Sequence, residues 1–132
     1  MVKALFDHNM PPPIARALRA LVSVDGHSAF ALRDKFDQRI KDVALYEELG
    51  REKEWIVFSK DVAQAKRKPE RAAILRGGIL VFYLAPSVEK LPPNQQAATI
   101  LWHWEAIVAQ RKNNENGLFL LPQNKGAKFR SI

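Results

Sequence analysis

Apolar and polar residues follow one another in blocks that predict strands and helices in alternation. Short apolar runs bounded by polar residues predict five strands, at residues 2–6, 27–32, 55–58, 79–84 and 118–121. Apolar residues at helical spacing predict helices that begin at the prolines 11–13, over 37–51, over 62–75 in two pieces broken at Pro69, and over 94–111. The run at 79–84 is apolar throughout, which indicates a central strand.

This alternation is typical of an α/β fold, in which a mostly parallel central sheet is covered by helices on both faces. We expect a single domain over residues 1–132, because no internal repeat or low-complexity tract divides the chain. In open parallel sheets, ligands bind outside the carboxyl ends of the strands. The residues that follow the strands are therefore the first candidates for a functional site.

The helical patterns also assign roles to single residues. The apolar stripe of the first helix consists of Ile14, Leu18, Leu21 and Val22. Asp37 follows a charged loop, and we expect it to be the N-cap of the helix over 37–51. Trp102 and Trp104 could stack on bases, but in an amphipathic helix we expect such residues in the core or in an interface. Homodimerisation through this long helix is one hypothesis.

Three aspartates are expected to converge at one edge of the sheet. Asp7 ends the first strand, and Asp61 follows the strand at 55–58. Asp42 lies near the start of the second predicted helix, on the same face as Leu45 and Leu49, so it should point inward. If the first and third strands are neighbours, the three carboxylates meet. Grouped carboxylates repel one another unless a cation is present, and Mg²⁺ and Mn²⁺ take such oxygen ligands.

Each aspartate also has a purely structural interpretation. Asp7 and Asp61 both precede helices, where an Asp N-cap stabilises by about 1 kcal/mol. Asp42 could be a first-turn acid that favours the helix dipole. Other catalytic schemes find little support, because the chain has no Cys, no phosphate-cradling Gly-rich loop and no Gly-x-Ser-x-Gly motif around Ser59.

The charge of the chain is concentrated in its second half. The net charge is +7; residues 63–132 carry 11 Lys or Arg and 4 Asp or Glu, whereas residues 1–62 carry 10 of each. Such asymmetry favours a polyanionic partner such as RNA, although a solvated basic surface would look the same. The basic side chains nearest the predicted acidic edge are Lys60, Lys66, Arg67 and Lys68.

Composition points to the inside of a cell. The absence of Cys fits a reducing compartment, no signal peptide is evident, and no apolar run approaches the roughly 18 residues needed to cross a bilayer. We expect a soluble, cytoplasmic protein.

Two stretches resemble the PIN-like toxin families related to VapC. The first is Leu5-Phe6-Asp7-His8-Asn9-Met10-Pro11-Pro12, similar to a strand that runs into Asp-Glu-Asn-Leu-Pro and then a helix, with His8 where many members have Glu. The second is Trp55-Ile56-Val57-Phe58-Ser59-Lys60-Asp61, similar to a strand that ends in Thr or Ser, a basic residue and Asp. Asp42 falls where these families place an acid at the head of the middle helix.

The resemblance implies a PIN-like fold, a Mg²⁺- or Mn²⁺-dependent ribonuclease activity, and the role of toxin beside a cognate antitoxin protein. It implies that Asp7, Asp42 and Asp61 are metal ligands and that Asn9 and Ser59 support the site by hydrogen bonds. No fourth acid is identified. The alternative hypotheses are a non-catalytic binding module for nucleic acid or protein and, third, a small-molecule phosphatase on a similar frame.

Overall fold

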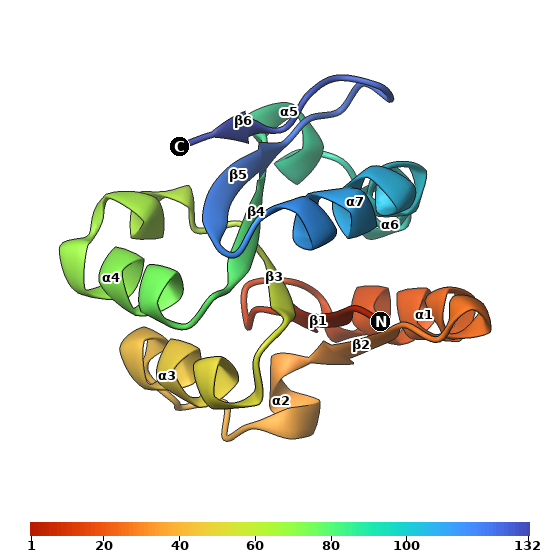
Figure 1. The fold of residues 1–132 in the computed structure, drawn as a ribbon. Helices are drawn as coiled ribbons and strands as arrows, with labels where there is room; N and C mark the ends of the chain where they lie inside the picture. Colours follow the sequence, from red (N-terminus) through yellow and green to blue (C-terminus); the bar gives the residue numbers. More distant parts are fainter.

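The computed structural model describes residues 1–132 and contains one six-stranded sheet with the strand order β2-β1-β3-β4-β5-β6 (Figure 1). The strands are β1 Lys3–Phe6, β2 Ser28–Ala31, β3 Trp55–Ser59, β4 Leu80–Leu84, β5 Gly117–Leu121 and β6 Arg130–Ser131. Strands β1 to β5 run parallel to one another, and only β6 is antiparallel. The predicted α/β fold with a mostly parallel sheet is confirmed.

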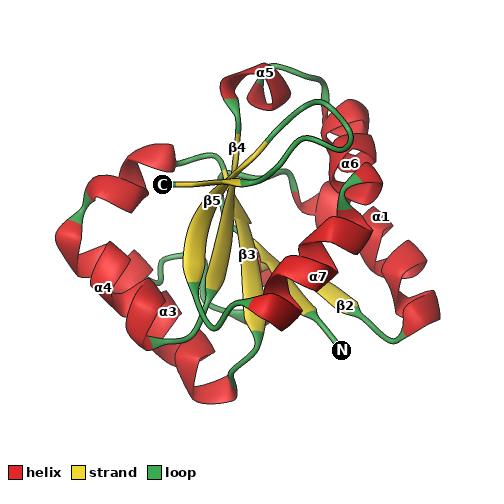
Figure 2. Ribbon diagram, turned by 45° about the horizontal axis from the view of Figure 1, so that its top comes forward, coloured by secondary structure: helices red, strands yellow, loops and turns green.

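Helices cover both faces of this sheet, as in a three-layer fold (Figure 2). The α-helices are α1 Pro12–Val22, α2 Leu32–Lys35, α3 Asp42–Glu52, α4 Lys68–Arg76, α5 Pro86–Glu89, α6 Pro93–Trp102 and α7 Trp104–Asn113, with 3-10 turns η1 Ser23–Asp25 and η2 Val62–Lys66. One hydrophobic cluster joins the sheet to α1, α6 and α7, and a second joins its other face to α3 and α4. None of these helices has the length and apolar character needed to span a membrane.

A row of phenylalanines crosses the sheet near its carboxyl edge. Phe6, Phe58, Phe82 and Phe119 occupy matching positions on four adjacent strands, and their ring centroids are 4.8, 5.7 and 5.6 Å apart. Each neighbouring pair contributes about 0.5–1.5 kcal/mol beyond its buried area. The row fixes the register of the strands, so the residues directly after Phe6 and Phe58 lie at the same level.

The second long helix begins later than expected. It spans Asp42–Glu52 rather than 37–51, with Lys41 as its N-cap, so the prediction that Asp37 is the N-cap was wrong. The Asp37 carboxylate instead accepts a hydrogen bond from the backbone N–H of Arg39 at 2.9 Å and forms a turn. Leu21, expected in the apolar stripe of α1, is 56% exposed. The buried stripe consists of Ile14, Ala15, Leu18 and Val22, and Leu21 lies to one side of it.

The helix predicted over 94–111 is two helices that meet at His103. The backbone N–H of His103 is shared between the carbonyls of Thr99 and Ile100, and its buried ring nitrogen Nε2 lies 2.8 Å from the carbonyl oxygen of Pro122. This contact joins the helix junction to the loop after β5, a tertiary constraint that helical periodicity does not contain. The predictions also missed β6 and the short helices α2 and α5.

Candidate functional site

The first and third strands are neighbours, as the convergence of the acids requires. Phe6 pairs with Phe58 in the parallel ladder between β1 and β3, so Asp7 and Ser59 follow side by side at the carboxyl edge. The Ser59 hydroxyl is fully buried and donates a hydrogen bond to Oδ2 of Asp7 at 3.1 Å. It accepts hydrogen bonds from Nδ2 of Asn9 at 3.2 Å and from the backbone N–H of Asp61 at 3.1 Å. Ser59 therefore links two of the predicted ligands directly.

Asp7 is a buried carboxylate that does not cap a helix. Only 2% of the residue is exposed, and its Oδ1 accepts from the backbone N–H of His8 at 2.8 Å and lies 2.9 Å from Nδ1 of the same residue. The N-cap of α1 is Pro11, so the capping interpretation of Asp7 is wrong. Asp61 is the N-cap residue of η2, as that interpretation expects, but its carboxylate makes no cap hydrogen bond.

Asp42 and Asp61 meet through Arg67 rather than directly. Nη2 of Arg67 lies 2.6 Å from Oδ2 of Asp61 and 3.8 Å from Oδ2 of Asp42, and its Nε also pairs with Glu70. The hydrogen bonds to Asp61 and then to Glu70 raise the pKa of the Arg67 guanidinium above its usual value. One cationic group thus contacts three carboxylates: one on the residue before η2, one in α3 and one in α4.

Asp42, Asp61 and Glu70 are arranged around the Arg67 guanidinium and do not form a cluster of their own. No group of three or more His, Cys, Asp or Glu side chains in residues 1–132 is placed so that it could hold a metal ion. Asp7 belongs to the same constellation through Ser59, whereas Asp42 and Asp61 are brought together only by Arg67. The three acids therefore do not converge on one point: Asp42 and Asp61 pair with Arg67, and Asp7 is joined to Asp61 only through Ser59. These residues form a linked network at the carboxyl edge, and its positive charge comes from Arg67.

Two buried tyrosines and one glutamine underlie this network. Oε1 of Gln64 accepts hydrogen bonds from the hydroxyl of Tyr46 at 2.6 Å and from the hydroxyl of Tyr83 at 2.8 Å, while its Nε2 has no partner. Burial, followed by the negative charges of the neighbouring groups, raises the pKa of both hydroxyls; Asp7 and Asp42 act on both. The bridge ties together α3, η2 and β4, which position Asp42 and Asp61.

The four predicted RNA-binding side chains differ in their exposure and in their contacts. Lys66 and Lys68 are exposed and flank Arg67 at the junction of η2 and α4, where the chain leaves the 3-10 turn. This junction, and not Pro69, is the helix break; Pro69 lies in the first turn of α4. Lys60 is half-buried, and its backbone N–H donates to Oδ1 of Asn9 at 3.1 Å. Only Arg67 contacts the acids.

Arg111 is part of the basic excess but has a structural role. Its guanidinium donates to the carbonyls of Trp55 and Gly78 at 3.0 and 2.8 Å, and to those of Asn114 and Glu115 at 3.0 and 2.6 Å. Burial lowers the pKa of this guanidinium below its usual value. Since Trp55 begins β3 and Gly78 precedes β4, Arg111 lies at the amino edge of the sheet, away from the acids.

Sequence reasoning missed Glu70, Gln64, Tyr46 and Tyr83. The spacing of Arg67 and Glu70, three residues apart where a helix begins, is the one local signal that could have identified the fourth acid. Gln64 follows Asp61 by three residues, but its two tyrosine partners lie 18 and 19 residues away along the chain. Nothing in the local pattern distinguishes those tyrosines from ordinary core residues.

The sequence comparison agrees with this architecture. A sequence model of the family described as PIN like domain matches residues 2–86, which hold β1 to β4 and every acid of the network. No curated protein and no solved structure shows a significant match to the chain. Because the matched segment is well over half of the chain, the protein belongs to the PIN-like domain family.

Proposed function

We propose that the protein is a metal-dependent endoribonuclease whose Mg²⁺ or Mn²⁺ is held by Asp7, Asp42 and Asp61. The observation that carries this proposal is the carboxyl edge of the sheet, where carboxylates from three separate elements surround one cationic group. Building such a cluster into a fold is unfavourable unless positive charge neutralises it. A network of this kind at the ligand-binding edge of a parallel sheet supports a catalytic role.

The chemical types of these donors fit a hard divalent cation, although in this structure the donors are arranged around Arg67 and not around one point. All the candidate donors are carboxylate or hydroxyl oxygens, which Mg²⁺ and Mn²⁺ prefer. The side chains of Asp61, Asp42 and Glu70 are 38%, 27% and 14% exposed, so they can be reached from solvent. Arg67 already shows that a positive charge is stabilised there. Glu70 adds the fourth carboxylate that the sequence did not identify.

Each residue of the network has a distinct task in this proposal. When bound, the metal would lower the pKa of a water molecule and stabilise charge on a phosphate. Ser59 orients Asp7 and holds the backbone of Asp61, and Asn9 holds Ser59. Arg67 neutralises the carboxylates before the cation arrives and is then free to contact the RNA backbone. Lys60, Lys66 and Lys68 supply further phosphate contacts, which position RNA without reading its sequence.

The biological role follows from the resemblance to VapC-related toxins. In this proposal the protein is the toxin of a type II toxin–antitoxin pair, and the cognate antitoxin covers the acidic edge. Co-expression tests this role: expression of the protein alone should arrest growth, and expression of a neighbouring gene product should restore it. Growth that is unaffected by the active nuclease would contradict the toxin role and leave the nuclease intact.

A second candidate is a non-catalytic binding module, and the pairing of Arg67 favours it. The guanidinium satisfies Asp42, Asp61 and Glu70 without any metal ion. In that case the basic side chains bind nucleic acid and the acids only hold Arg67 and the junction between η2 and α4.

Cleavage of total RNA and tRNA by the purified protein separates the two candidates. The test compares cleavage reactions in Mg²⁺, in Mn²⁺ and in EDTA. Cutting that requires the divalent ion supports the nuclease. Binding without cutting, with the same affinity in EDTA, supports the module.

A further inference from the structure

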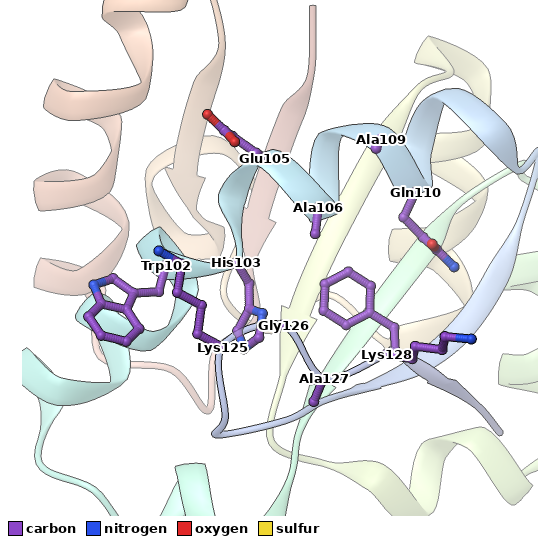
Figure 3. A pocket seen from close by; sticks show the side chains of 11 residues that line it. Trp102, His103, Glu105, Ala106, Ala109, Gln110, Lys125, Gly126, Ala127 and Lys128 are labelled. Carbon is purple, nitrogen blue, oxygen red and sulfur yellow. The ribbon is translucent and has the colours of Figure 1, made fainter.

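A surface pocket with an exposed tryptophan lies outside the acidic network and shares no residue with it. It is formed by the junction of α6 and α7 and by the loop at 122–129 that follows β5, and its volume is about 590 Å³ (Figure 3). Trp102 is 65% exposed, so it does not lie in the core; the alternative expectation, a place in an interface, stays a prediction. Trp102 is the last residue of α6 and lies away from the face formed by the buried residues Gln96, Thr99 and Ile100.

The pocket combines aromatic surface with positive charge. Nζ of Lys125 lies 5.0 Å from the centroid of the Trp102 ring, and Lys128 lines the opposite end beside Gln110 (Figure 3). Glu105 is the only acid among the lining residues. Phosphate groups are attracted by two lysines, and bases stack on an aromatic face, so the pocket carries the two elements that single-stranded nucleic acid needs.

The space between these groups suits a flat ring. Ala106 and Ala109 of α7, with Gly126 and Ala127 of the loop, line the middle of the pocket with small side chains. A volume of about 590 Å³ lies in the roughly 300–1,000 Å³ range of small-ligand pockets. Gln110 and Glu105 add hydrogen-bonding groups for the edge of a base.

The loop that closes the pocket is anchored to the core. Nε2 of His103 lies 2.8 Å from the carbonyl oxygen of Pro122 at the start of the loop. At its end, the Phe129 ring packs edge-on against His103 and Phe82, with centroids 5.5 and 5.2 Å apart. The lysines of the loop are therefore carried between two fixed ends.

We propose that this pocket binds one unpaired nucleotide of the RNA that the acidic edge cuts, with the base on Trp102 and the phosphates at Lys125 and Lys128. The proposal rests on the proposed ribonuclease function for the identity of the ligand. The loop follows the carboxyl end of β5, at the same edge as the acids. Strand β5 is two strands from β3, which corresponds to roughly 10 Å along the sheet edge. The pocket lies on the side of the sheet that α6 and α7 cover, opposite α3 and α4, so the RNA would cross the carboxyl edge between the two sites. The subsite would hold RNA a few nucleotides away from the cut.

RNA fits these observations better than a protein segment does. The two lysines match the phosphates of RNA, whereas a peptide would match them only if it were acidic. The exposed ring and the two lysines match the alternation of base and phosphate along a single strand. The basic excess of residues 63–132 has the same sign.

The test is RNA binding in EDTA, which removes cleavage from the measurement. The probe is a fluorescein-labelled single-stranded RNA oligonucleotide followed by anisotropy, with the full chain. Because stacking on one aromatic side chain is typically worth a factor of about 5–150 in affinity, Trp102→Ala should weaken binding about tenfold. Trp102→Phe, which keeps a ring, should recover most of that loss, and the same RNA in a duplex should show no effect of Trp102→Ala.

The contribution of Lys125 and Lys128 is measured by the dependence of RNA affinity on salt concentration. Lys125→Ala and Lys128→Ala should each reduce the slope of log affinity against log salt by about one unit. Lys90→Ala, at an exposed lysine that does not line the pocket, is the matched control and should change affinity less.

Two results would overturn the subsite. One is single-stranded binding by Trp102→Ala that equals that of the unaltered protein, while metal-dependent cleavage continues; the proposed function would then stand without the subsite. The other is a loss of self-association or of antitoxin binding in Trp102→Ala with RNA binding unchanged, which would make the pocket a protein interface.

Discussion

The guanidinium of Arg67 lies 2.6 Å from the carboxylate of Asp61, measured from Nη2 to Oδ2. The same guanidinium is 3.8 Å from Asp42 and also pairs with Glu70. A cation that binds these carboxylates must therefore displace the guanidinium or share the acids with it. In the proposed nuclease, Arg67 would therefore compete with the metal for these carboxylates and would become available to RNA when the metal is bound.

Removal of the guanidinium should tighten metal binding. For Arg67→Ala we expect Mn²⁺ to bind about fivefold more tightly, because a partly exposed ion pair no longer has to be broken. Isothermal titration calorimetry of Mn²⁺ without RNA measures this directly. The control is Arg76→Ala in the last turn of the same helix, which should leave Mn²⁺ affinity unchanged. Weaker Mn²⁺ binding by Arg67→Ala would show that the guanidinium does not compete with the ion.

Loss of the Ser59 hydroxyl should affect both stability and activity. Ser59→Ala leaves the buried Asp7 carboxylate without one donor and the backbone N–H of Asp61 without its acceptor. We expect a loss of about 1–3 kcal/mol in the free energy of unfolding, measured with urea. RNA cleavage should fall more than about tenfold under conditions in which the variant remains folded, since groups that orient metal ligands are worth about 10–100-fold. Unchanged cleavage in a folded variant would remove Ser59 from the site.

The buried tyrosines predict a loss of stability at high pH. In the folded state the pKa of Tyr46 and of Tyr83 is raised, whereas in the unfolded chain a tyrosine titrates near pH 10, at about its ordinary value. The unfolded state therefore releases these protons first, so the stabilisation is complete below about pH 10 and declines as the pH rises further.

Urea unfolding between pH 8 and 11 measures this decline. The variant Tyr46→Phe/Tyr83→Phe should show a shallower dependence on pH above 10 than the unaltered protein, because the lysines contribute equally to both. An identical slope in the two proteins would contradict the assignment.

Arg111 should contribute to the free energy of unfolding and not to RNA affinity. Arg111→Met leaves four backbone carbonyls without their donor, and we expect a loss of about 2–4 kcal/mol in the free energy of unfolding. Lys112→Met, at the exposed neighbouring position, should cost little. RNA affinity measured on folded Arg111→Met should equal that of Lys112→Met; a much lower value would place the amino edge of the sheet in the RNA-binding surface.

The strands and the candidate acids at their ends could be predicted from the sequence, because both are encoded in short stretches of the chain. Apolar runs define the strands, and the acids that follow two of these strands, directly at Asp7 and after Ser59-Lys60 at Asp61, led to the predicted site. Ser59 entered only through the family resemblance. That β1 pairs with β3 was only a condition of the argument, and the structure supplies it. Asp42 was found from its position one helical turn before residues of the core.

The rest depends on contacts between distant segments. Helical periodicity could not show that the chain breaks at His103, because the ring is held by Pro122, 19 residues further along the chain. In the same way, net charge could not separate Arg111, which binds backbone carbonyls, from Arg67, which binds acids.

The central claim is that Asp7 serves a metal-dependent nuclease site. The most direct measurement is the rate of RNA cleavage by Asp7→Asn in saturating Mn²⁺, beside Asp25→Asn, a matched change at an exposed acid in η1. We predict that Asp7→Asn lowers the rate more than about 100-fold, because even groups that only orient ligands are worth about 10–100-fold, and that Asp25→Asn keeps full activity. Equal, EDTA-sensitive cleavage by both variants would contradict the claim and place the nuclease site elsewhere.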